Sequence, residues 1–133
     1  MEVDFKTKIS SLDIRQREWF ATATVAMMLA DGNIDRSEMD FILRIIQMVK
    51  DETVVDRLKK FIQFQTQPPL GKPVGISRKL AMTMILDLIR IAVSDKDFDA
   101  KEKAMIHQIG ENLGFSETEV DKLVMYGFEL MVQ

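Results

Sequence analysis

The stretch Ala30-Asp31-Gly32-Asn33-Ile34-Asp35-Arg36-Ser37-Glu38 occurs a second time, in altered form, as Ser94-Asp95-Lys96-Asp97-Phe98-Asp99-Ala100-Lys101-Glu102. The acidic positions that the two copies share lie 64 residues apart (95 − 31) and are Asp31 with Asp95, Asp35 with Asp99, and Glu38 with Glu102. Apolar positions around them follow the same shift, as Ile42 and Ile106 do. An internal repeat of this kind predicts two similar structural units.

The chain around the repeat has the three-to-four spacing of apolar residues that is typical of amphipathic helices. This spacing predicts helices over about 13–29, from about 36, over 54–64, 77–93 and 100–113, and a last one opened by residues 116–119. Residues 67–75 contain all three prolines and two glycines, so this stretch is expected to be a connection. Residues 1–10 are expected to form an arm or a short helix.

These segments predict an all-α fold, a single-domain helical bundle of about six to seven helices. Its two pseudo-symmetric halves would span about 11–66 and 76–132, with the linker 67–75 between them. A half is too short to bury its own apolar faces, so the two halves are expected to share one core within residues 1–133.

Bulk composition excludes several classes of protein. The net charge of −3 gives no general attraction for nucleic acid. The absence of cysteine excludes disulfides, thiol catalysis and thiolate metal sites. No apolar run reaches the roughly 18 residues that span a bilayer, and the first residues do not form a signal peptide. We therefore expect a cytoplasmic protein without direct membrane insertion.

The acidic residues have a purely structural interpretation. Asp35 with Glu38, and Asp99 with Glu102, have the spacing of a helix capping box. In a capping box the aspartate accepts hydrogen bonds from the first backbone N–H groups of the helix. Both carboxylates also favour the positive end of the helix dipole.

Capping leaves two features unexplained. Glu38 and Glu102 lie on the apolar stripes of their helices, which predicts that they face the interior near the end of the preceding helix. Asp31 and Asp95 are expected at that end, where the dipole disfavours a carboxylate. Carboxylates that converge in this way repel one another, and a divalent cation or a basic partner would relieve the repulsion.

An ordinary EF-hand does not fit these residues. Asp31, Asn33 and Asp35 match the first three ligand positions of the calcium loop. Arg36, however, stands where the loop needs glycine, and Ile42 where it needs a bidentate glutamate. The second copy departs from the EF-hand pattern at the corresponding two positions.

Two segments, 28–38 and 91–102, together with 109–116, resemble TerB-like domains, which are named from tellurite-resistance proteins. The resemblance covers about residues 15–130. It implies an all-helical fold with two related halves and an acidic surface or metal site without catalysis, in a family linked to stress response and membrane-associated complexes. The matching positions are Asp31, Asp35, Glu38, Asp95, Asp99 and Glu102. One departure is Lys96, which stands where the first copy has Gly32 and would partly neutralise the second cluster.

If a metal binds, the oxygen donors favour calcium, magnesium or manganese. His107 is the single histidine, and no nucleophile signature accompanies it, so an enzyme is not expected. A second hypothesis from the residues is a helical scaffold or protein-interaction domain, in which the acidic residues are only helix caps and a methionine-rich groove, or a homodimer, makes the contacts. The methionines within helices are nevertheless predicted to fill the core.

Overall fold

The computed structural model describes residues 5–30, 32, 34–93 and 98–132. Over these residues the chain is all-helical, which confirms the predicted fold class. The elements are a 3-10 helix η1 (Ile9–Ser11), α1 (Ile14–Leu29), α2 (Arg36–Gln47), α3 (Glu52–Gln63), α4 (Arg78–Val93), α5 (Ala100–Asn112) and α6 (Glu117–Val132). Helix α3 begins two residues earlier than expected because the Asp51 side chain accepts a hydrogen bond from the Val54 N–H and caps it. Within the described residues, no helix is both long and apolar enough to cross a bilayer.

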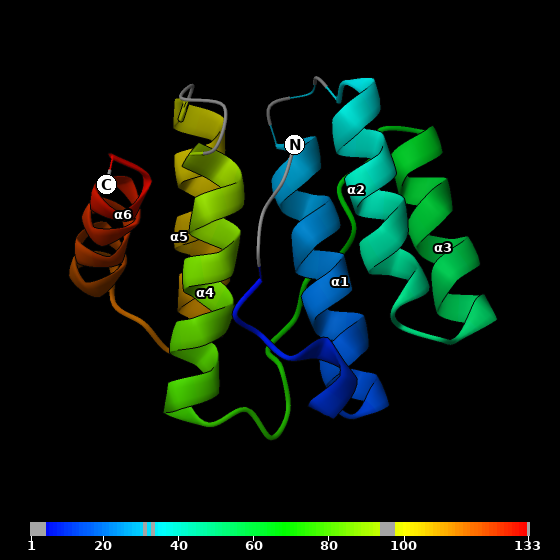
Figure 1. The fold of residues 1–133 in the computed structure, drawn as a ribbon, viewed down its shortest axis with the longest axis horizontal. Helices are drawn as coiled ribbons and strands as arrows, with labels where there is room; N and C mark the ends of the chain where they lie inside the picture. The colour runs from blue at the N-terminus through cyan, green and yellow to red at the C-terminus, as the bar shows by residue number, and fades with distance from the viewer. Residues whose placement is uncertain (1–4, 31, 33, 94–97, 133) are drawn as a thin grey trace.

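Helices α1 and α4 lie side by side at the centre of the molecule (Figure 1). Every residue of α1 from Trp19 to Leu29 is buried, so this helix has no polar face in its second half. A helix that is apolar all round must be covered on all sides. Helices α2 and α3 pack against α1, α5 and α6 pack against α4, and α5 also contacts α1.

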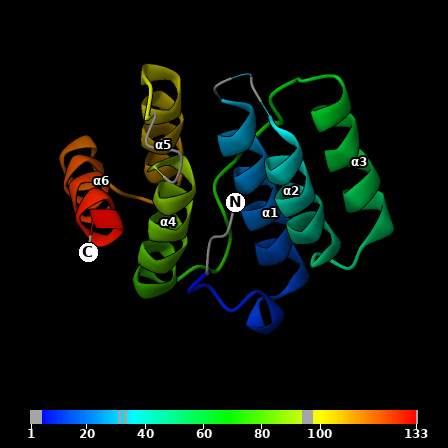
Figure 2. The same ribbon diagram turned by 45° about the horizontal axis from the view of Figure 1, so that its top comes forward.

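The central helices run in the same direction, so the chain leaves both of them at the same end of the bundle (Figures 1 and 2). Helices α2 and α5 begin at that end and run back along α1 and α4. The six helices share one continuous apolar core. The equivalence of the two halves stays a prediction.

The proline-containing connection is not helical, as predicted, and it is held along α1. Side-chain donors on α1 and in the connection make three hydrogen bonds, namely Gln67 Nε2 to the Ala26 carbonyl (3.0 Å), Trp19 Nε1 to the Gly71 carbonyl (2.7 Å) and Gln16 Nε2 to the Gly75 carbonyl (3.0 Å). As the residue number rises in the connection, the number of its partner on α1 falls. The connection therefore runs antiparallel to α1, toward the start of α4.

A buried carboxylate ties the N-terminal segment to α4. Asp87 is fully buried and accepts hydrogen bonds from the backbone N–H groups of Lys6 (2.9 Å) and Thr7 (2.8 Å). The Asp87 carboxylate also accepts a hydrogen bond from the Thr7 hydroxyl. It forms an ion pair with Arg90, which lies one turn further along α4. Burial of a carboxylate is tolerated only with such partners. The sequence pattern of α4 did not reveal this role.

The prediction that helical methionines fill the core is only partly right. Met27, Met28 and Met84 are buried, and Met105 is half-buried against the core. Met48 and Met82 are exposed, however. Met48 is the C-cap residue of α2 and is 42% exposed, and Met82, on α4, is 37% exposed.

Two glycines permit close approach between helices in the second half. A Cβ added to Gly110 would lie closer than 3.0 Å to the Val120 side chain, and one added to Gly127 would be equally close to Ile89. We expect Gly110→Ala and Gly127→Ala each to lower the free energy of unfolding by about 1–3 kcal/mol through overpacking, as measured by urea denaturation. Gly71→Ala is the matched control, because its new Cβ meets nothing within 4 Å. Equal effects at all three positions would contradict this packing.

Removal of the Asp87 carboxylate should be costly. Asp87→Ala leaves the Arg90 guanidinium and two backbone N–H groups without their acceptor. We expect a loss of about 3 kcal/mol in the free energy of unfolding, in the range found when one partner of a buried pair is removed. Asp40→Ala removes an exposed carboxylate and should have little effect. If Asp87→Ala lowered the free energy of unfolding no more than the control does, the contacts of Asp87 would contribute nothing to stability.

Candidate functional site

Helix α2 begins with the capping box that the sequence predicted. The Asp35 carboxylate accepts a hydrogen bond from the Glu38 backbone N–H (2.8 Å), and the Glu38 carboxylate accepts one from the Asp35 N–H (3.4 Å). The second of these bonds is long, so it holds the glutamate only weakly.

Helix α5 begins in the same way. The Asp99 carboxylate accepts from the Glu102 N–H (2.8 Å), and the Glu102 carboxylate accepts from the Asp99 N–H (3.4 Å). The predicted capping boxes at Asp35 and Asp99 are thereby confirmed. Both boxes lie at the end of the bundle where the central helices end (Figures 1 and 2).

The two glutamates differ in their burial. Glu102 is only 5% exposed, as expected for a side chain on the apolar stripe, whereas Glu38 is half-buried. The difference accompanies the packing, because α5 lies against three helices, α4, α6 and α1, while α2 lies against α1 and α3. The prediction that the side chain faces the interior is therefore confirmed for Glu102. The Glu38 side chain faces the interior only in part.

Two of the six predicted ligands, Asp31 and Asp95, lie outside the described residues. In the part of the chain that is described, no three acidic or histidine side chains are placed to hold one metal ion. Whether the six carboxylates form one site, two sites or none stays a prediction.

Electrostatics at the start of α2 favour an ionised carboxylate. The hydrogen bond from the Glu38 backbone N–H lowers the pKa of Asp35 below its usual value. A similar box at the start of α6 lowers the pKa of Glu119, first through the Ser116 backbone N–H and then through the charge of Arg78. Asp35 is therefore charged at neutral pH and available to attract a cation.

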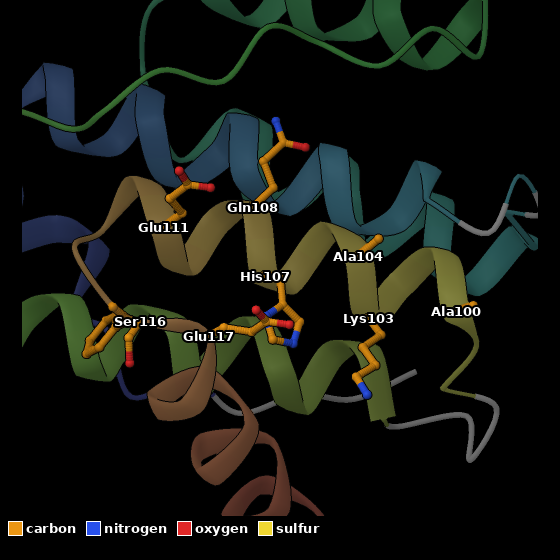
Figure 3. A pocket seen from close by; sticks show the side chains of 9 residues that line it. Ala100, Lys103, Ala104, His107, Gln108, Glu111, Ser116 and Glu117 are labelled. Carbon is orange, nitrogen blue, oxygen red and sulfur yellow. The ribbon is translucent and has the colours of Figure 1, made fainter.

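Sequence reasoning missed a surface groove beside His107. The His107 Nε2 lies 2.9 Å from Asp121 Oδ1, which links α5 to α6. Figure 3 shows Lys103 and His107 projecting from α5 toward the side where Glu117 lies. The groove is open and carries charges of both signs. The four-residue spacing of Lys103 and His107 marks this face of α5, but the sequence did not indicate that the start of α6 would border it.

Comparisons with known proteins gave one match. The family model described as "Tellurite resistance protein TerB" matches residues 74–124, which cover the end of the connection, α4, α5 and the first half of α6. No curated protein and no solved structure matches significantly. The match confirms the resemblance over this segment, which contains Asp95, Asp99 and Glu102. The first acidic stretch lies outside it.

The lowered pKa of Asp35 predicts a pH dependence. An aspartate in the unfolded chain has a pKa of about 3.9, and the folded value lies below it. The charged cap therefore stabilises the fold fully above that pH and ceases to do so as the pH falls through the folded pKa. Asp35→Ser keeps a capping oxygen without the charge.

We expect the wild type to melt at a higher temperature than Asp35→Ser at pH 7, and the difference to shrink as the pH is lowered below about 4. Thermal melts followed by circular dichroism over this pH range measure the difference in melting temperature between the two proteins. A difference that stays constant with pH would show that the charge of Asp35 does not matter.

Proposed function

We propose that this chain is a non-catalytic, TerB-like helical module whose paired acidic loops bind a divalent cation, a basic protein partner, or both. The observation that carries the proposal is the placement of both capping boxes at one end of the bundle (Figure 1). In the sequence, Asp31 precedes the first box by four residues and Asp95 precedes the second by four.

Helix ends add to the negative potential there. Helices α1 and α4 both finish at this end, and the last carbonyl groups of a helix carry partial negative charge and lack partners within the helix. Carbonyl and carboxylate oxygens are the donors that calcium, magnesium and manganese prefer. The capping aspartates can take part, since a carboxylate that accepts one N–H bond retains further acceptor positions.

Glu102 strengthens the proposal for the second loop. A carboxylate that is 5% exposed is costly to keep charged, and a nearby cation would offset that cost.

The alternative is a protein-interaction module in which the carboxylates only cap helices. The observation in its favour is the apolar surface of α6, where Met125 is 65% exposed, Tyr126 49% and Phe128 39%. Large exposed apolar side chains on one helix often mark a contact surface. Such a module would act within a stress-response or membrane-associated complex, as the resemblance implies, or as a homodimer in the cytoplasm.

The decisive experiment is calorimetric titration of the metal-free protein with calcium, magnesium and manganese, with the melting temperature followed in parallel. We expect saturable binding of at least one ion and a raised melting temperature, because a ligand that binds only the folded state stabilises it. Asp31→Asn with Asp95→Asn should abolish both effects.

The matched control is Asp40→Asn with Asp56→Asn, which removes the same charge from exposed positions on α2 and α3. It should leave binding intact. If none of the three ions binds, cation binding is excluded, and pull-downs with the acidic-loop variant then test whether a partner depends on these residues.

A further inference from the structure

A second groove lies on the side of α1, away from the acidic end. It is bordered by α1, α3 and the connection, and its cavity volume is about 210 Å³. The side chains and backbone that matter for its chemistry are Arg15, Glu18, Trp19, Arg57, Gly71 and Lys72.

The groove has a fixed framework. Arg15, Glu18 and Trp19 are spaced three to four residues apart, so they lie on one face of α1. The Trp19 indole N–H donates to the Gly71 carbonyl and fixes the connection across this face. Trp19 itself is buried, so the groove has a rigid floor.

Positive charge gathers around the groove from three different elements. Arg15 comes from α1, Arg57 from α3 and Lys72 from the connection. Glu18 pairs with Arg57 and is the one acidic side chain in the lining. Arg15 and Lys72 make no ion pair with any described residue, so the lining carries a net charge of +2 in a chain whose overall charge is −3.

The position of Arg15 is unfavourable for the helix alone. It lies in the first turn of α1, which contains no acidic residue, and the positive end of the helix dipole, which the Asp13 carboxylate at the N-cap offsets only in part, disfavours a cation. Three like charges around one groove also repel one another. An anion bound among the three basic side chains would offset both the unfavourable position of Arg15 and the repulsion between the like charges.

We propose that this groove binds a phosphate group, with Arg15, Arg57 and Lys72 as its charged ligands. A dianion matches the net charge of the lining. The volume is below the roughly 300–1,000 Å³ of pockets for drug-sized ligands, so the groove accepts free phosphate or the phosphate end of a small molecule. Arg57 can serve both Glu18 and the anion, because a guanidinium has five N–H donors.

The test is a titration of the full chain at low ionic strength with inorganic phosphate in one arm and glycerol phosphate in the other. Calorimetry gives the affinity. Fluorescence of Trp19, the single tryptophan, reports whether the ligand is at this groove. We expect saturable binding that weakens about tenfold or more in Arg15→Gln with Lys72→Gln, because two charge-assisted hydrogen bonds are lost.

The control is Lys59→Gln with Lys60→Gln, which removes the same charge from exposed positions of α3 outside the groove. It should leave the affinity within about twofold of the wild type. Tighter binding of the ester assigns the groove to a phosphorylated small molecule, and equal or tighter binding of inorganic phosphate assigns it to the free ion. No saturable binding in either arm, or equal weakening in both variants, would overturn the proposal.

Discussion

The complete burial of the second half of α1 is the constraint on which the rest of the structure depends. No residue between Trp19 and Leu29 reaches solvent appreciably. Two threonines are tolerated there because their hydroxyl groups donate to carbonyls one turn earlier, Thr22 to Glu18 and Thr24 to Phe20. A helix of this kind is not stable alone, so four helices and the connection have to cover it.

That covering determines where the acidic residues lie. Helix α4 is the second central helix, and it lies beside α1 and runs in the same direction (Figure 1). The chain must then turn at the same end after each of them, and each turn is followed by a helix that begins with an aspartate and a glutamate. The common location of the two boxes is thus a consequence of how the apolar helices pack.

Local patterns in the sequence predicted the local structure well. The Asp-x-x-Glu spacing identified the caps of α2 and α5, and the prolines identified the connection, because both effects act within a few residues. The inward direction of Glu102 was also predicted, but other features that depend on tertiary contacts were not. The burial of Asp87 follows from an N-terminal segment 80 residues away, and the basic groove joins residues from three elements. The exposure of Met82 depends on which face of α4 the other helices leave uncovered.

The two proposed sites use opposite ends of one helix. Helix α1 has 16 residues, so its ends are about 24 Å apart. Its positive end lies at the basic groove, and its negative end lies at the end of the bundle where the capping boxes begin α2 and α5 (Figure 1). This distance is several times the Debye length of about 8 Å at physiological ionic strength, so an ion at one end has little electrostatic effect on an ion at the other. Any coupling between the sites would therefore have to pass through the packing of α1, whose buried half leaves little room for movement.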